Sequence, residues 1–353
     1  MLAYALLAIV ASAPQKPVVE INFDLVGNRI YLPAKLSGRS ISAIFDTGAG
    51  GSAVDLSLAD ELKIPGDQKI QAGGVGANQV TGRILTGAKL EIGDTTHNVP
   101  YAIPFSSLNS AEGRKLELIL GYDFINRYVF QIDYAQKRMK IYPAGTKLED
   151  LGAEIPIRIV GGHPHIRTKI TLGGTTHDIE AMIDSGATQG GLTARFTKMV
   201  AIPSNVKATA TTTIGGGVGG FVTGRFIRLD AIDLGGFKSI NPVVSVNESG
   251  DGANGTTSNY DLLLGAEVLK RFTFTIDYPN GKVYFKPNSE FGKPFEADKS
   301  GLRLTASGPD LRQYAIVGIL PSSTSEAAGL KAGDKLEVEI SGIGTLGVNV
   351  VDE

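Results

Sequence analysis

The feature that most constrains the fold of this chain is an internal duplication, with the same motifs in the same order in both halves. The letters IFDTGA at 44–49 return as MIDSGA at 182–187, and VTGR at 80–83 returns at 222–225. Further along, ILG at 119–121 returns as LLG at 263–265, and IDY at 132–134 returns at 276–278. The offset drifts only from 138 (184 − 46) to 144 (277 − 133), so the chain carries a duplicated unit with small insertions in its loops.

Each unit is predicted to consist mainly of β-strands. The segments 21–35 and 155–172 alternate apolar and polar residues around glycines, which is typical of strands. Asn280-Gly281 between two apolar runs predicts a tight hairpin. Helices are expected to be few and short, one over 122–128 and its partner after Gly265. Asp123 and Glu267 fall in the first turns of these helices, so we interpret them as caps rather than catalysts.

The composition excludes several kinds of function. A net charge of −2 over 353 residues gives no reason to expect nucleic acid as a main partner. The chain has no cysteine, which excludes disulfides, thiolate metal ligands and cysteine nucleophiles, and it has only four histidines. We therefore expect neither a metal nor a cofactor.

The N-terminal residues 2–13 form a run of apolar and small residues that ends in Ala11-Ser12-Ala13. The run is too short to span a bilayer, and no later stretch is long and apolar enough to do so. An apolar run closed by such a site is typical of a secretory signal, although this one lacks a basic start. We predict a signal peptide over 1–15 and a periplasmic or secreted protein; the alternative is an apolar N-terminus or a misplaced start codon.

The two Asp-(Thr/Ser)-Gly-Ala turns carry the predicted chemistry. An apolar strand delivers Asp46 to one turn and Asp184 to the other, and the following glycine permits a sharp bend. Two copies related by a pseudo-twofold axis would place the carboxylates face to face, where they would share one proton. One carboxylate could then act as a base on a water while the other donates a hydrogen bond to a carbonyl. The alternative is that both aspartates merely cap turns.

On these motifs the sequence resembles the aspartic peptidases, nearest to the retropepsin-like enzymes of bacteria, over about residues 20–290. The resemblance implies two homologous retropepsin- or pepsin-like β-barrel lobes in one chain, with catalytic Asp46 and Asp184. It also implies that Thr47 and Ser185 tie the two loops together, with Gly48 and Gly186 supporting the turns. The apolar-apolar-Gly elements at 119–121 and 263–265 would pack behind the loops. Such a chain would be an aspartic-type endopeptidase that acts on polypeptides without a metal.

Two glycine-rich segments lie where the family has its flaps, the hairpins that close over the peptide. The predicted substrate-binding residues are Gly73, Gly74, Val75, Gly76, Gly215, Gly216, Gly217 and Val218. Glycine lets the flap backbone pair with the backbone of an extended peptide; the alternative is two ordinary hairpin tips. Gly215, Gly217 and Gly220 also spell G-x-G-x-x-G, but a strand rather than a helix is expected to follow, which argues against dinucleotide binding.

Three other features of the sequence could suggest a function. Asp133 and Asp277 also repeat, and we interpret both as turn residues after a strand. His163-Pro164-His165 lacks a third ligand nearby and is interpreted as a surface strand rather than a metal site. Ala49 and Ala187 stand where pepsin-like members usually have Ser or Thr. Fewer donors to the carboxylates would raise their pKa values, so we expect activity nearer to neutral pH than pepsin's.

The last residues do not follow the repeat. Residues 326–334 are similar to the Ala-Gly-Leu-x-x-Gly-Asp core of bacterial PDZ domains, preceded by an expected strand over 314–320. PDZ domains bind the end of a polypeptide by β-strand addition, but about 50 residues are short for one, so the final strand and second helix are expected to be missing. We thus predict lobe 1 over 16–150, lobe 2 over 151–292 and a partial α/β PDZ-like module over 293–353, in a monomeric endopeptidase. The alternative function is a catalytically silent peptide-binding or scaffold protein on the same fold.

Overall fold

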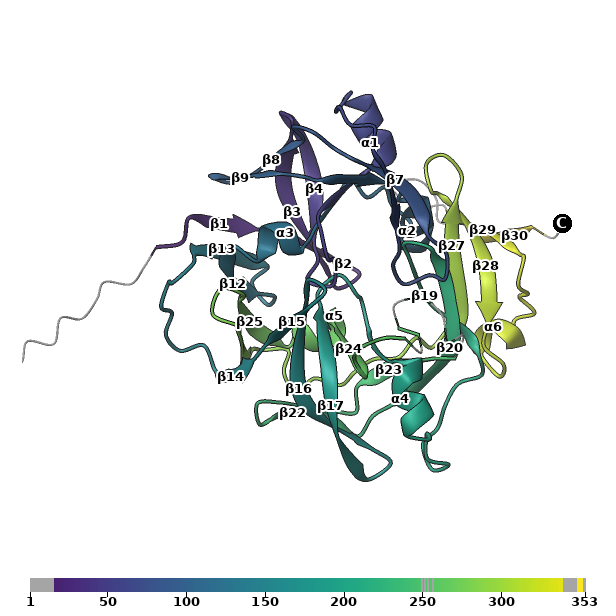
Figure 1. Ribbon diagram of the computed structural model, residues 1–353. Helices are drawn as coiled ribbons and strands as arrows, with labels where there is room; N and C mark the ends of the chain where they lie inside the picture. Colours follow the sequence, from purple (N-terminus) through teal and green to yellow (C-terminus); the bar gives the residue numbers. More distant parts are fainter. Residues whose placement is uncertain are drawn as a thin grey trace, which may run out of the picture.

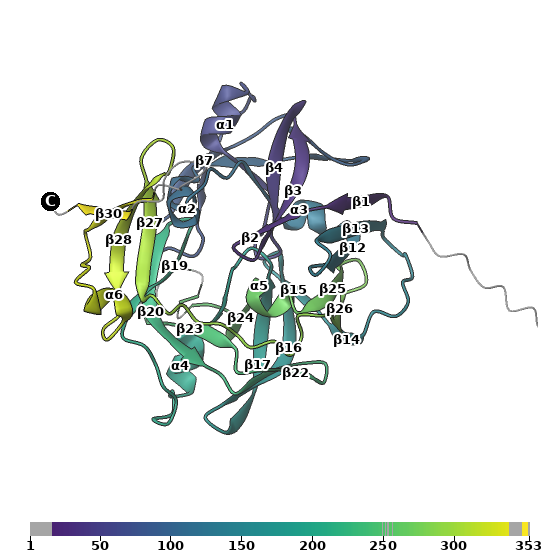
Figure 2. The same cartoon turned by 180° about the vertical axis from the view of Figure 1, so that it is seen from behind.

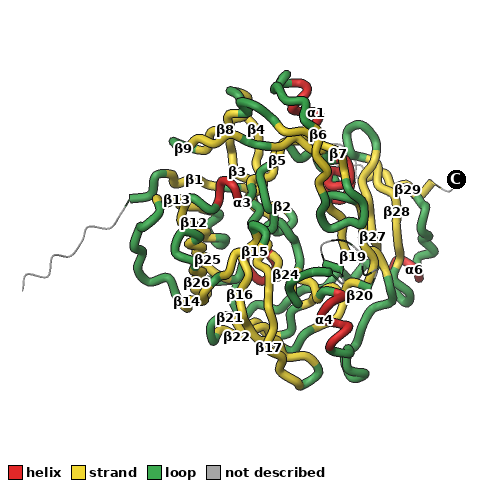
Figure 3. Tube along the Cα trace, in the orientation of Figure 1, coloured by secondary structure: helices red, strands yellow, loops and turns green. Residues whose placement is uncertain are grey.

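A computed structural model describes residues 16–248, 250, 252, 254–255, 257–338 and 348–351. The described strands form two ten-stranded sheets, a six-stranded sheet and a four-stranded sheet. Figure 1 shows the two ten-stranded sheets above and below the centre, the six-stranded sheet at one side and the four-stranded sheet at the other. The tube in Figure 3 shows that strands dominate both halves and that the helices are short.

Lobe 1 is built on the first ten-stranded sheet, in the order β6-β7-β10-β5-β11-β4-β3-β8-β9 with β2 paired to β3. Its strands are β2 (Asp24–Val26), β3 (Arg29–Leu36), β4 (Arg39–Phe45), β5 (Ala53–Asp55), β6 (Lys69–Ala72), β7 (Val80–Ile84), β8 (Lys89–Ile92), β9 (Thr95–Asn98), β10 (Tyr101–Ile103) and β11 (Leu118–Leu120). Its helices are α1 (Leu56–Glu61), α2 (Ser106–Glu112) and α3 (Tyr122–Ile125).

Lobe 2 repeats this topology strand for strand, in the order β19-β20-β23-β18-β24-β17-β16-β21-β22 with β15 paired to β16. Its strands are β15 (Arg158–Val160), β16 (His163–Leu172), β17 (Thr175–Asp184), β18 (Gly190–Leu192), β19 (Thr212–Gly217), β20 (Gly220–Arg228), β21 (Ala231–Leu234), β22 (Phe237–Ile240), β23 (Val243–Asn247) and β24 (Leu262–Gly265). Its helices are α4 (Ala194–Met199) and α5 (Ala266–Leu269).

The six-stranded sheet joins the lobes. Its order is β1 (Val19–Asn22), β13 (Arg138–Pro143), β12 (Tyr128–Asp133), β25 (Phe272–Asp277), β26 (Lys282–Pro287) and β14 (Ala153–Pro156). At its centre β12 pairs antiparallel with its own repeat β25, and Gln131 lies opposite Thr275, its equivalent at an offset of 144. A strand that pairs with its own copy about equivalent residues defines a pseudo-twofold axis between the halves.

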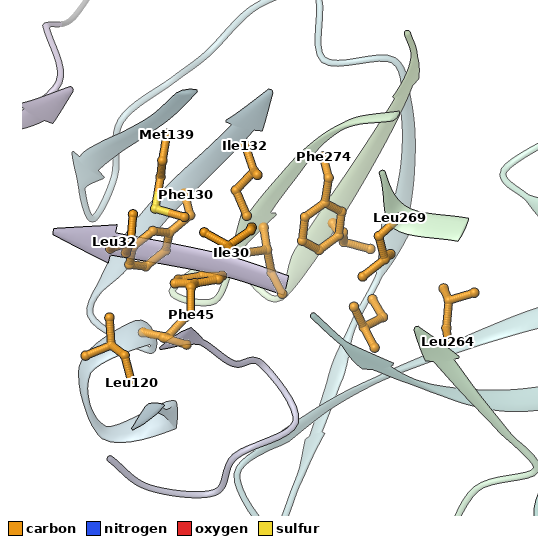
Figure 4. Close-up of a cluster of buried hydrophobic side chains, with 14 of the residues drawn as sticks. Ile30, Leu32, Phe45, Leu120, Phe130, Ile132, Met139, Leu264, Leu269 and Phe274 are labelled. Carbon is orange, nitrogen blue, oxygen red and sulfur yellow. The ribbon is translucent and has the colours of Figure 1, made fainter. Parts of the chain in front are cut away.

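The hydrophobic core is continuous from one lobe to the other. Its buried side chains run from Leu32 and Phe45 of lobe 1, through Phe130 and Phe274 of the shared sheet, to Leu264 of lobe 2 (Figure 4). Burial of this apolar surface is the main force that holds the lobes in a fixed relation. The core therefore fixes where the two Asp turns meet.

The C-terminal sheet contains β27 (Leu302–Ser307), β28 (Gln313–Ile319), β29 (Lys335–Val338) and β30 (Val348–Val351), with α6 (Thr324–Ala327) after β28. Strand β30 pairs antiparallel with β29 at the edge of this sheet. This sheet packs on α2 of lobe 1 and β19 of lobe 2 (Figure 2). Thr305 Oγ1 donates to the Ser110 carbonyl at 3.4 Å, and the Arg303 guanidinium lies 4.9 Å from the centre of the Phe226 ring.

Of the local predictions from the sequence, the hairpin is confirmed and one helix is shorter than expected. The hairpin at Asn280-Gly281 joins β25 to β26, with Gly281 at φ 64°, as expected. Helix α3 is shorter than the predicted 122–128, because β12 already begins at Tyr128. No helix in the described ranges is long and apolar enough to cross a membrane. The proposed signal peptide over 1–15 lies outside the described residues.

Candidate active site

Asp46 and Asp184 stand at the ends of equivalent strands at the centre of the molecule. Asp46 follows β4, and its N–H donates to the Leu120 carbonyl at 3.0 Å; Asp184 is the last residue of β17. Each strand pairs in parallel with the apolar-apolar-Gly element of its own half, β4 with β11 and β17 with β24. The apolar-apolar-Gly element therefore lies next to each aspartate, as expected. Its pairing with β4 or β17 holds the end of that strand in place.

Thr47 and Ser185 cross from one turn to the other. The Thr47 hydroxyl donates to the Ile183 carbonyl at 2.9 Å and accepts from the Ser185 N–H at 2.9 Å. Ser185 Oγ donates to the Phe45 carbonyl at 2.8 Å and accepts from the Thr47 N–H at 3.1 Å. Both side chains are fully buried, so the four bonds clamp the turns without competition from water.

Each glycine after the hydroxyl residue lies against the carboxyl group of the other half. A Cβ added to Gly186 would lie 2.3 Å from Asp46 Cγ, and one added to Gly48 would lie 2.4 Å from Asp184 Cγ. The two carboxyl groups lie close enough for the negative charge of Asp184 to help raise the pKa of Asp46. The structure thus brings Asp46, Asp184, Thr47, Ser185, Gly48 and Gly186 together in one site.

The two carboxyl groups have different surroundings. The Asp46 carboxylate accepts the Gly48 N–H at 2.8 Å, whereas that of Asp184 accepts the N–H groups of Gly186 and Ala187, both at 2.9 Å. Burial and the neighbouring Asp184 charge raise the pKa of Asp46 well above its usual range. Burial also raises the pKa of Asp184, but hydrogen bonds from Asp46 and from the two amides oppose the rise. The two groups therefore titrate as a pair that can share one proton.

Arg29 is a residue of this site that the motifs did not indicate. Its Nε donates to the Gly186 carbonyl at 2.5 Å, and its Nη1 pairs with Glu112 of α2 at 2.5 Å. Both side chains of the pair are 12% exposed, and the positive charge of Arg29 lowers the pKa of each aspartate. A largely buried positive charge that shifts the pKa values of nearby carboxyl groups is typical of functional sites.

The predicted flap residues also converge. Gly73, Gly74, Val75 and Gly76 form a loop between β6 and β7, while Gly215, Gly216 and Gly217 end β19, with Val218 at the hairpin tip. The Gly76 N–H donates to the Val218 carbonyl at 3.0 Å, and the Asn78 N–H donates to the Gly219 carbonyl at 3.2 Å. The two tips therefore touch each other, a contact that the sequence did not indicate. Strand β20 follows the G-x-G-x-x-G letters, as expected.

The other repeated acids have structural roles. Asp133 accepts the Gln136 N–H at 2.9 Å and Asp277 accepts the Asn280 N–H at 3.1 Å, so both close turns as predicted. Asp123 and Glu267 lie in the first turns of α3 and α5, but neither caps its helix.

Instead, Asp123 accepts the Ser52 N–H at 2.5 Å, and Glu267 accepts from Asn28 at 2.7 Å. The interpretation of these two acids as caps is therefore wrong.

The interpretation of 163–165 as a surface strand is also wrong. His165 is 1% exposed, Pro164 is buried and His163 is half-buried. The sequence His163-Pro164-His165 does not indicate that β16 lies inside lobe 2, where it pairs with β17 on one side and β21 on the other. Within the described ranges no three His, Asp or Glu side chains gather in a way that could hold a metal ion.

The family follows from the sequence. The profile of the aspartyl protease family matches residues 32–124 and 168–268, which together are more than half of the chain. The chain belongs to the aspartyl protease family. Each matched segment of this aspartyl protease contains one Asp turn and the apolar-apolar-Gly element that follows it.

Curated relatives resemble one part of this aspartyl protease. The DNA damage-inducible protein 1 of Chaetomium globosum is 30% identical over 146 residues, and that of Neurospora crassa is 28% identical over 145 residues. Each match covers 39% of this chain and 31% of the relative, so the chain corresponds to about a third of the length of these relatives. A solved aspartic proteinase from Irpex lacteus is similar over 78% of this chain and 98% of its own, with 12% identity and a TM-score of 0.49.

Proposed function

We propose that this protein is an aspartic endopeptidase that hydrolyses peptide bonds with a water molecule activated between Asp46 and Asp184. The observation that carries the proposal is the close approach of the half-buried Asp46 and the buried Asp184, each with the glycine of the opposite turn against its carboxyl group. A dyad that merely capped turns would have no need to be brought together across a twofold axis. A silent scaffold on the same fold would not need both acids either.

In the proposed reaction the two aspartates have different roles. The Asp184 carboxylate accepts a proton from the water, which attacks the carbonyl carbon of the scissile bond. Asp46 donates its proton toward the carbonyl oxygen and so stabilises the negative charge that develops there. A proton then passes to the nitrogen of the leaving amine as the tetrahedral intermediate breaks down. The backbone amides that face Asp184 favour its ionised form, which supports this assignment.

An extended peptide would lie between the Asp turns and the flap tips. Each tip places a valine against a glycine of the other tip: a Cβ on Gly217 would lie 3.0 Å from Val75 Cβ, and one on Gly74 would lie 2.8 Å from Val218 Cβ. The inter-flap bonds at Gly76 and Asn78 would have to open when a substrate enters. Backbone amides freed in this way could pair with the peptide backbone.

The test is cleavage of a peptide library by the wild-type protein and by the variants Asp46→Asn and Asp184→Asn. Removal of either group should lower kcat/KM at least about a hundredfold, because each supplies half of the acid–base chemistry. Asp133→Asn is the matched control, since Asp133 repeats in the same way but closes a turn. Full activity of either dyad variant would reject the mechanism. Peptide binding without turnover in the wild type would favour the scaffold function.

The C-terminal residues, the localisation and the oligomeric state complete the proposal. We propose that residues 293–353 form a PDZ-like module, supported by the four-stranded sheet with α6 and by the Ala-Gly-Leu turn. Its binding of a polypeptide end would be tested by titration with C-terminal peptides. Export to the periplasm or medium and a monomeric state are likewise proposals, tested by fractionation of cells and by light scattering.

A further inference from the structure

The repeat places equivalent side chains on both sides of the Asp dyad. In lobe 1, Tyr31 of β3 pairs with Ile44 of β4, and Ile44 lies beside Ile119 of β11. In lobe 2, His165 pairs with Met182, and Met182 lies beside Leu263. His165 is therefore the counterpart of Tyr31.

Residues three positions before Ile119 and Leu263 complete the two sets with Leu116 and Tyr260. The set beside Asp46 is defined as pocket A (Tyr31, Ile44, Leu116 and Ile119), and the set beside Asp184 as pocket B (His165, Met182, Tyr260 and Leu263).

Both pockets adjoin the dyad. The apolar cluster of pocket A packs against Ala49 of the first Asp turn and Val218 of the opposite flap. The apolar cluster of pocket B packs against Ala187 of the second Asp turn. Burial, together with the negative charge of Asp184, raises the pKa of Tyr260. Pockets in these two positions would contact the substrate residues on either side of the scissile bond.

Each pocket holds one buried polar atom without a printed partner among the described residues, the Tyr31 hydroxyl in pocket A and Nε2 of the His165 imidazole in pocket B. Nδ1 of His165 lies 2.9 Å from a carboxylate oxygen of Glu180, and its ring meets Tyr260 edge-on at 5.6 Å. Nε2 is buried and has no hydrogen-bond partner among the described residues. A buried polar atom without a partner is costly, so such an atom beside a binding cleft is a candidate ligand contact.

The neighbours of His165 determine what Nε2 can bind. A carboxylate only accepts hydrogen bonds, so Glu180 requires the proton of a neutral imidazole to be on Nδ1. Nε2 is then an acceptor. Arg158 pairs with the same Glu180 and helps to keep it ionised.

We propose that His165 makes pocket B selective for a substrate side chain that donates a hydrogen bond, such as an amide or a hydroxyl. This inference rests on the proposed endopeptidase function, since it requires a peptide in the cleft. Pocket A would not share this preference for donors, because the Tyr31 hydroxyl can donate as well as accept a hydrogen bond.

The test uses pairs of peptides that differ only by Leu or the isosteric Asn at one residue next to the scissile bond, on each side in turn. With His165→Leu, the ratio of kcat/KM for Asn over Leu should fall about tenfold on one side of the bond and stay unchanged on the other. His165→Gln keeps a hydrogen-bonding group and should retain part of the preference. The matched control is Tyr31→Leu, which should alter selectivity only on the opposite side.

Binding separates a failure of this inference from a failure of the proposed function. Non-cleavable peptides with a reduced bond, again in Asn and Leu versions, are titrated into the wild type, His165→Leu and His165→Gln by calorimetry. If no peptide is cleaved but the Asn version binds about tenfold tighter relative to the Leu version in wild type than in His165→Leu, the function is wrong and the pocket assignment stands. An unchanged Asn-to-Leu ratio in folded variants overturns the inference, because a buried water would then satisfy Nε2.

Discussion

Thr47 and Ser185 exchange hydrogen bonds across the axis that relates the two halves, each hydroxyl accepting the backbone N–H of the other residue at 2.9 and 3.1 Å. Each hydroxyl also donates to a carbonyl of the opposite strand. Because every one of these groups is buried, the arrangement holds only when both halves are folded and in register.

The first prediction concerns this clamp. Thr47→Val keeps the shape of the side chain but leaves the Ser185 N–H and the Ile183 carbonyl without partners. Each buried unpaired group costs about 1–3 kcal/mol, so we expect a loss of about 2–5 kcal/mol in the free energy of unfolding. Urea titration measures it. Thr176→Val, at an exposed position of β17, is the control and should change little. A loss below about 1 kcal/mol would show that the clamp does not join the lobes.

The second prediction concerns Gly186. A methyl group there would lie 2.3–2.5 Å from the Asp46 carboxyl atoms, so Gly186→Ala must displace that carboxyl group. We expect kcat to fall at least about a hundredfold, because displacement by an ångström is enough to disable an oriented group. Gly174→Ala is the control. Gly174 has φ 85°, so an alanine there would strain the backbone, but far from the dyad. If both variants lose equal activity, the loss reflects stability rather than geometry.

The sequence was sufficient for the duplicated unit and for the dyad, because both are written as local motifs at a nearly constant offset. It was insufficient for contacts that arise only when the copies meet. Arg29 reaches Gly186, and Val218 meets Gly76, across the pseudo-twofold axis, so neither contact leaves a pattern along the chain. The burial of His165 was missed for a related reason. Strand β16 lies between neighbouring strands of its sheet. The alternation of apolar and polar residues within β16 carries no information about these neighbours.

The third prediction concerns pH and stability. The pKa of Asp46 is higher in the folded than in the unfolded protein, so the folded state binds more protons between the two pKa values. Stability from this group is greatest below the unfolded pKa near 3.8 and is lost as pH rises through the folded pKa. Asp46→Asn removes this loss. The variant should therefore gain stability over the wild type as pH rises from about 3 to 7. Thermal unfolding across this range measures the gain, and a constant difference would mean that the pKa of Asp46 is not raised.

The fourth prediction concerns Arg29 and the pH dependence of activity. The positive charge of Arg29 lowers the pKa of both aspartates. In Arg29→Gln the acid limb of the kcat/KM profile should move to higher pH, because the general base then loses its proton less readily. The variant also leaves Glu112 unpaired in a site that is 12% exposed, which should cost about 3 kcal/mol of stability. Arg29→Gln combined with Glu112→Gln relieves that cost but leaves the charge effect on the dyad. For the double variant we expect the stability to recover while the acid limb stays at higher pH. An acid limb that returns to its wild-type position would mean that Arg29 acts only through packing.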